Sequence, residues 1–190
     1  MSASLALAVL DLCETAEHGL DYFRAHGIDM GAVTTATGGV FISPIRIVPP
    51  RFFEPDPEGK PAAWCEVRDD FGSVVDVAAW SMRKPDRVVT LLGRAAVLGA
   101  EWAGDPASYL DGSPLRVFRT PLAWLQAQCE GVAVLDMAKA ARFLIDTPTP
   151  RIAAEDDAHA REIIKAKHAL WDAQAVVVPV RNHQPLREAA

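Results

Sequence analysis

The sequence lacks the cysteine pairs, the long apolar runs and the excess of basic residues that would assign it to several large classes of protein. Its three cysteines, Cys13, Cys65 and Cys129, lie far apart and include no C-x-x-C pair, which argues against a disulfide framework or a zinc knuckle and favours a reducing, cytoplasmic setting. No apolar run approaches the roughly 20 residues that cross a bilayer, so we expect no membrane partner. The net charge is −6, which argues against non-specific nucleic-acid binding, because a protein that binds nucleic acid through its phosphates is usually basic.

The motifs of the common catalytic classes are also missing. None of the five histidines has H-x-x-x-H or H-E-x-x-H spacing, no serine lies in a G-x-S-x-G elbow, and neither G-x-G-x-x-G nor a P-loop is present. We therefore expect no cofactor. Whether the protein is an enzyme is left open, and the missing catalytic constellation favours a non-enzymatic role.

What is present is an ordinary globular composition, with 50% hydrophobic and 23% charged residues. Nothing marks a boundary between domains, so residues 1–190 are expected to form a single domain that ends in a polar tail over 181–190. Residues 1–27 are predicted to be one N-terminal helix, because apolar residues recur at helical spacing from Leu5 to Phe23. Acidic residues directly follow the first apolar residues of this helix, which argues against a signal peptide.

The rest of the chain is predicted to hold strands first and then alternating elements. Residues 40–82, after a loop over 30–39, are expected to form antiparallel strands, because apolar runs flank an Asp/Gly turn at 69–72. Residues 85–180 are predicted to alternate between helix and strand, beginning with a helix over 85–102, and this alternation favours a parallel sheet. The expected class is α/β, with α+β as the alternative. One mixed sheet that joins the antiparallel hairpin region to a small βαβαβ unit is the favoured architecture, and two loosely separate halves are the alternative.

Acidic residues follow two of the predicted strands. Asp136 follows the apolar strand 132–135, and Glu155, Asp156 and Asp157 follow the next strand along the chain. If the two strands were parallel neighbours, these acids would meet at the sheet edge where ligands bind in open α/β sheets, and their oxygens would suit Mg²⁺. Asp136 and Asp156 or Asp157 also stand where a helix N-cap is expected. We favour helix capping, and a catalytic metal site of Asp136, Glu155 and Asp157 is the alternative.

Basic residues gather around the start of the helix expected over 85–102. They are Arg83, Lys84, Arg87 and Arg94. Arg87 and Arg94 are seven residues apart and would share one helix face. These four residues are the candidates for a nucleic-acid-binding face, although a solvated surface is the favoured interpretation of such charges.

The segment R-I-A-A-E-D-D-A-H-A over 151–160 resembles a motif of the Toprim fold of primases, topoisomerases and related nucleases. That family carries a Glu at one strand end and a D-x-D motif at another, and together they bind Mg²⁺. Here Glu155 replaces the first Asp of the motif, Ala160 replaces a Gly, and Asp136 stands in the slot of the family's Glu. The resemblance therefore implies a Mg²⁺-dependent nucleic-acid enzyme or an inactive relative with a degenerate site.

A second resemblance rests on the stretches 114–125, 129–136 and 153–159. They are similar to a group of small uncharacterised proteins encoded in phage-like and other accessory segments of bacterial genomes. This group supplies a context and no catalytic residues.

Three functional hypotheses follow. The leading one is a non-catalytic accessory or regulatory protein that binds another macromolecule, a protein more than a nucleic acid, and homo-oligomers are left open. The alternative is the Toprim-like enzyme or an inactive relative of one. The third is a regulatory module that binds nucleic acid through the Arg83–Arg94 face.

Overall fold

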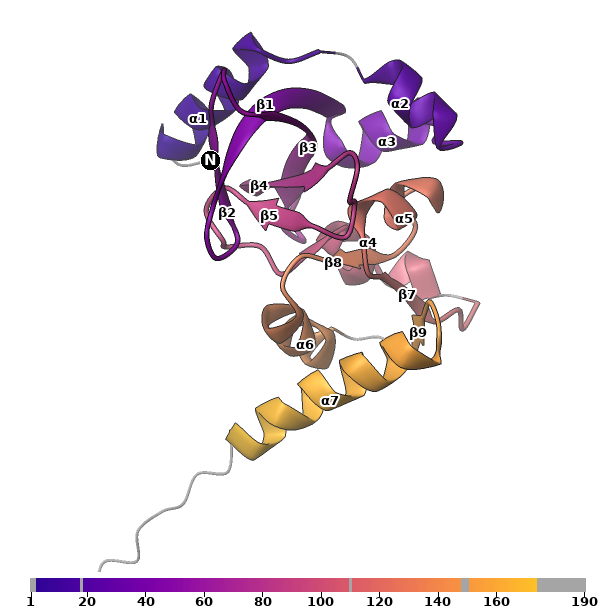
Figure 1. The fold of residues 1–190 in the computed structure, drawn as a ribbon. Coiled ribbons are helices and arrows are strands. Elements are labelled where there is room, and N and C mark those ends of the chain that lie inside the picture. Colours follow the sequence, from indigo (N-terminus) through magenta and orange to yellow (C-terminus); the bar gives the residue numbers. More distant parts are fainter. Residues whose placement is uncertain (1–2, 18, 110, 148–150, 174–190) are drawn as a thin grey trace, which may run out of the picture.

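The computed structural model describes residues 3–17, 19–109, 111–147 and 151–173 (Figure 1). Its first elements are α1 (Ala3–Glu14), α2 (Leu20–Ala25), α3 (Met30–Thr37), β1 (Val40–Val48), β2 (Phe52–Pro55), β3 (Lys60–Arg68), β4 (Val74–Ser81) and β5 (Val88–Thr90). They are followed by β6 (Val97–Leu98), α4 (Ala100–Gly104), the 3₁₀ helix η1 (Pro106–Tyr109), β7 (Leu115–Phe118), α5 (Pro121–Gln126), β8 (Val132–Val134), α6 (Met137–Asp146), β9 (Ile152–Ala154) and α7 (Asp157–Ala173). Within these residues no helix is both long enough and apolar enough to span a bilayer.

The strands form two sheets, whereas one mixed sheet was expected. β1, β2, β5, β4 and β3 close into a barrel in that order, and β6, β8, β7 and β9 form a separate four-stranded sheet (Figure 1). The α/β class with an N-terminal helix is confirmed, as are antiparallel strands over 40–82. The division has a simple cause: a parallel contact between β2 and β5 closes the first five strands on themselves. A closed barrel offers no edge to which the later strands could add.

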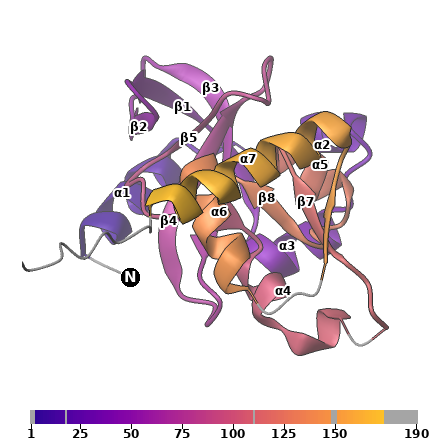
Figure 2. The ribbon, with the colours of Figure 1, turned by 90° about the horizontal axis from the view of Figure 1, so that it is seen from below.

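The four-stranded sheet is mostly parallel, as the alternating pattern predicts. β8 pairs with β6 on one side and with β7 on the other, and β9 pairs with the far side of β7. β8 is therefore an inner strand, in agreement with its fully apolar sequence, because strands covered on both faces are apolar throughout. Helices α6 and α7 lie side by side over one face of this sheet (Figure 2), and α5 packs on the other face.

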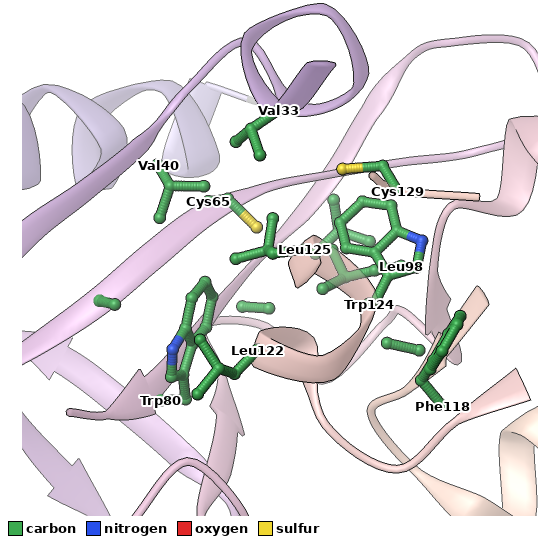
Figure 3. Close-up of a cluster of buried hydrophobic side chains, with 14 of the residues drawn as sticks. Val33, Val40, Cys65, Trp80, Leu98, Phe118, Leu122, Trp124, Leu125 and Cys129 are labelled. Atoms are coloured by element: carbon green, nitrogen blue, oxygen red, sulfur yellow. The ribbon is translucent and has the colours of Figure 1, made fainter. Parts of the chain in front are cut away.

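A single apolar cluster joins the barrel to the second sheet. Cys65 and Trp80 on the outer face of the barrel pack in one cluster with Trp124, Leu125 and Cys129 from around α5 (Figure 3). Burial raises the pKa of the Cys129 thiol to about 12 and raises that of Cys65 as well. Both thiols therefore stay protonated and serve as packing groups.

The helix predicted over 1–27 is broken in two. Between α1 and α2, Glu17 forms an antiparallel bridge with Ile42 of β1. Gly19 then passes so close to Ile42 that an added Cβ would lie 2.4 Å from its Cδ1 atom. The contact with the barrel thus overrides the helical periodicity, and Gly19 is the residue that permits it.

Two other local predictions were wrong. The expected loop over 30–39 contains α3, which Asp29 caps through the backbone N–H of Gly31 and which ends at Gly38 with φ of 74°. The expected helix over 85–102 gives way to β5 and β6, because the β-branched residues of β5 pair with β4, and only its end, from Ala100, is helical, in α4. The last part of the region predicted to alternate, 174–180, and the tail over 181–190 lie outside the described residues. The single-domain organisation stays a prediction.

Candidate functional site

The two acidic segments do not meet at the sheet edge. Their preceding strands, β8 and β9, are not neighbours, because β7 lies between them. Asp136 therefore leaves the sheet on one side of β7, whereas Glu155 and Asp157 leave it on the other. The proposed set of Asp136, Glu155 and Asp157 required β8 and β9 to be adjacent, so the structure does not assemble it.

Asp136 is the N-cap of α6, as predicted. Its Oδ1 atom accepts hydrogen bonds from the backbone N–H groups of Ala138 and Lys139, at 3.0 and 3.2 Å. Its Oδ2 atom lies 3.5 Å from Nη1 of Arg51, which precedes β2 of the barrel. The Lys139 ammonium donates to the backbone oxygen of Gly93. Asp136 thus joins the helix to the barrel, and both of its oxygens have partners.

The acids that follow β9 surround a cation that sequence analysis did not connect with them. Arg119 directly follows β7, and its Nη1 and Nη2 atoms contact the two carboxylate oxygens of Asp156 at 2.7 and 2.9 Å. The same guanidinium lies 3.6 Å from Oε2 of Glu155 and 3.9 Å from Oε2 of Glu162. The backbone N–H of Arg119 also donates to Oε2 of Glu155, at 3.2 Å. Three carboxylates therefore converge on one guanidinium.

Asp156 is at once an ion-pair partner and a helix cap. Its Oδ1 atom accepts the backbone N–H of His159 at 2.8 Å, which confirms the predicted capping of α7 by one of the two aspartates. The Arg119 hydrogen bond and this cap hold the pKa of Asp156 well below its usual range. Asp157 is the exposed first residue of α7, where the helix dipole favours a carboxylate.

His159 is fully buried beneath these acids. Its Nδ1 atom lies 3.4 Å from the backbone nitrogen of Glu155 and 3.7 Å from Oε2 of the same residue. Its Nε2 atom is buried and has no hydrogen-bond partner among the described residues. Burial and the nearby Arg119 guanidinium lower the pKa of His159, so the ring is neutral and packs the start of α7.

The donor set at this edge does not fit a divalent metal ion. Among the described residues, no three His, Cys, Asp or Glu side chains are placed to hold a metal together. Both oxygens of Asp156 face the Arg119 guanidinium, and Glu155 shares the same cation. A metal ion would have to displace Arg119 to reach them.

The four basic candidates do not form the expected helical face. Arg83, Lys84 and Arg87 lie in the turn that leads from β4 to β5, whereas Arg94 lies beyond the other end of β5. All four side chains are exposed. The predicted helix face is wrong, because the strand β5 separates Arg94 from the other three. Their role as a nucleic-acid-binding face stays a prediction.

Two further residues stand out that sequence analysis did not select. Asp76 of β4 is fully buried, and its carboxylate accepts backbone N–H groups from the segment 92–95. The available signal was a lone acid inside an apolar strand. Phe71, at the tip of the β3–β4 hairpin, is 87% exposed. The same hairpin lines a cavity of about 550 Å³ to which Arg68 and Arg94 contribute.

Comparisons with known proteins show a likeness of fold. Neither the protein-family models nor the curated proteins give a match. A structure of the DnaG catalytic core is similar with a TM-score of 0.50 at 13% identity, over 78% of this chain and 58% of that one. The E. coli primase catalytic core gives a TM-score of 0.49 at 14% identity, over 78% of this chain and 59% of that one. A DnaG primase catalytic domain bound to ssDNA gives a TM-score of 0.46 at 13% identity, over 82% of this chain and 57% of that one. The chain thus spans less than two thirds of the length of these structures.

Proposed function

We propose that this is a non-catalytic accessory protein that acts by binding another macromolecule. The observation that carries the proposal is that the strand-end acids are divided by β7 and each segment is already engaged. Asp136 caps α6 and meets Arg51, while Glu155 and Asp156 meet Arg119. A catalytic metal centre needs free oxygens that converge on one point.

The fold likeness to the DnaG catalytic core and the Toprim-like motif together support an inactive relative of such a domain. In the Toprim pattern a Glu at one strand end joins the D-x-D motif at another. The sequence put Asp136 in the slot of that Glu, but the strand beside β9 is β7, and the residue directly after β7 is Arg119. A positive charge in place of that Glu opposes metal binding, which favours loss of catalysis over its retention.

The first test is the response of the wild-type protein to metal. We expect millimolar Mg²⁺ or Mn²⁺ to leave its thermal unfolding midpoint unchanged. A metal ion that bound only the folded state would raise this midpoint. Asp157→Asn is the matched variant, since Asp157 is exposed and belongs to the alternative metal set. A metal-dependent rise in the wild type that is lost in Asp157→Asn would contradict the proposal.

The fold likeness to the DnaG catalytic core also supports a second candidate function, a Mg²⁺-dependent nucleic-acid enzyme. This candidate is tested by incubating the protein with single-stranded DNA, nucleoside triphosphates and Mg²⁺, and separately with DNA alone and Mg²⁺. A metal-dependent product or cleavage that Asp157→Asn abolishes would favour the enzyme. The proposed function instead leads us to expect neither product.

The exposed apolar side chains support a protein as the partner. Phe71 is 87% exposed, and Leu7 and Leu10 of α1 are 64% and 60% exposed. Contiguous exposed apolar patches mark contact surfaces, and Phe, Tyr and Trp contribute much of the energy of protein interfaces. The cavity beside the Phe71 hairpin gives a partner chain a recess next to this anchor.

Phe71→Ser is therefore expected to weaken partner binding by about tenfold or more, the effect of truncating an aromatic hot spot. The free energy of unfolding should change by less than about 0.5 kcal/mol, because the ring is exposed. Proteins captured by the wild type would be purified and titrated against both forms by calorimetry, with Phe71→Tyr as the control that retains the ring. Equal affinity for the wild type and Phe71→Ser would remove Phe71 from the interface.

A further inference from the structure

The end of β7 and the start of α7 are joined by one cation and three carboxylates. The Arg119 guanidinium contacts both oxygens of Asp156 at 2.7 and 2.9 Å and lies within 4 Å of Glu155 and Glu162. Without a cation, three like charges this close would repel one another and would weaken the contact between strand and helix. Some positive charge is therefore a structural requirement of this edge.

The carboxylates are held in place by more than the guanidinium. Glu155 accepts the backbone N–H of Arg119, and Asp156 accepts the backbone N–H of His159. The buried His159 ring packs beneath Glu155. These contacts do not depend on the side chain of Arg119. A variant that lacks the guanidinium would keep Glu155 and Asp156 pointing toward the same space.

We infer that Arg119 is a built-in counter-cation. It supplies at this edge the positive charge that a divalent metal ion would supply in a Toprim-like site, and it excludes such an ion. The inference rests on the proposed function. It makes Arg119 a positioning residue, which acts through Glu155 and Asp156. Arginine suits the task because its planar, permanently charged fork matches a carboxylate with two parallel hydrogen bonds.

The test is a set of three variants followed by thermal unfolding with and without Mn²⁺. Arg119→Gln removes the charge, and Arg119→Lys retains it without the planar fork. Arg116→Gln is the matched control, because Arg116 lies on the same strand and forms an exposed ion pair with Glu130 at 3.6 Å. We expect Arg119→Gln to lower the unfolding midpoint by about 2–4 °C, and Arg116→Gln to leave it nearly unchanged.

Metal dependence is the measurement that separates the two possible roles of Arg119. If Arg119 formed only a structural ion pair, its replacement would not make the unfolding midpoint depend on metal. Millimolar Mn²⁺ should raise the midpoint of Arg119→Gln and leave the wild type, Arg119→Lys and Arg116→Gln unchanged. Calorimetric titration with Mn²⁺ should show binding to Arg119→Gln alone, and Asp156→Asn added to that variant should abolish it.

The opposite results separate this inference from the proposed function. An Arg119→Gln variant that shows no response to Mn²⁺ in either measurement overturns the counter-cation role and leaves the non-catalytic proposal standing. Binding of Mn²⁺ by the wild type at Asp156, shown by its loss in Asp156→Asn, overturns both. A variant that folds only when Mn²⁺ is present supports the inference.

Discussion

Replacement of Asp76 by Ala is expected to lower the free energy of unfolding by about 3–5 kcal/mol, because each buried N–H group left without an acceptor costs about 1–3 kcal/mol. The Asp76 carboxylate accepts the backbone N–H groups of Leu92 at 2.8 Å, Arg94 at 2.6 Å and Ala95 at 3.2 Å. The residue is fully buried, so water would not readily replace it. These bonds shape the segment that leads from the barrel into the second sheet.

Two variants make the Asp76 prediction specific. Asp76→Asn has nearly the same shape and keeps one acceptor oxygen, so its stability should lie between that of the wild type and that of Asp76→Ala. Asp70→Ala, at an exposed position in the neighbouring turn, should change stability by less than about 0.5 kcal/mol. Urea unfolding followed by tryptophan fluorescence measures all three. A loss below about 1 kcal/mol for Asp76→Ala, the value of an ordinary hydrogen bond, would mean that the segment 92–95 finds other acceptors.

Local signals in the sequence predicted the second half of the chain well. Thr120 caps α5 and Pro121 is its first residue, and both residue types are favoured at these positions of a helix. Asp136 was predicted to cap the next helix and does so. The apolar run 132–135 gave the inner strand β8. In each case the determining contacts lie within a few residues of one another, which is why a single sequence is sufficient.

Predictions that depended on distant residues were wrong or missing. The segment 85–102 has helical spacing of apolar residues, yet β4 pairs with β5 and Asp76 binds the backbone that follows. Closure of the barrel depends on the contact between Phe52 and Thr90, which no local pattern marks. The break between α1 and α2 depends on Ile42. Tertiary contacts decide such segments, and they override local propensity.

The candidate site was missed for the same kind of reason. The sequence correctly marks Asp136 and the acids at 155–157 as strand-end residues, but their grouping assumed an order of strands. One inserted neighbour, β7, separates the two acidic segments and introduces Arg119. Arg119 is 36 residues before Glu155 in the chain, and no spacing rule connects them. The chemistry of the edge therefore follows from topology, which the sequence does not state.

Replacement of Leu12 by Ala should lower the free energy of unfolding by about 2–5 kcal/mol, the usual cost of truncating a buried Leu. Leu12 lies on the buried side of α1, is fully buried, and packs in the same cluster as Phe53 and Trp64 of the barrel. Hydrogen bonds reinforce the contact: the Trp64 indole N–H donates to Ser43 Oγ at 2.9 Å, and the Ser43 hydroxyl donates to the backbone oxygen of Leu12 at 3.0 Å. The side chain therefore cannot be removed without leaving a cavity between α1 and the barrel.

Leu10→Ala is the matched control for this prediction, because Leu10 belongs to the same helix and is 60% exposed. It should change stability by less than about 0.5 kcal/mol. Both variants remove the same atoms and alter helix propensity equally, so the difference between them reports the packing of α1 alone. Chemical unfolding curves for the two proteins give this difference directly. Equal, small losses would show that α1 is only loosely attached, whereas a large loss confined to Leu12→Ala would establish α1 as part of the barrel core.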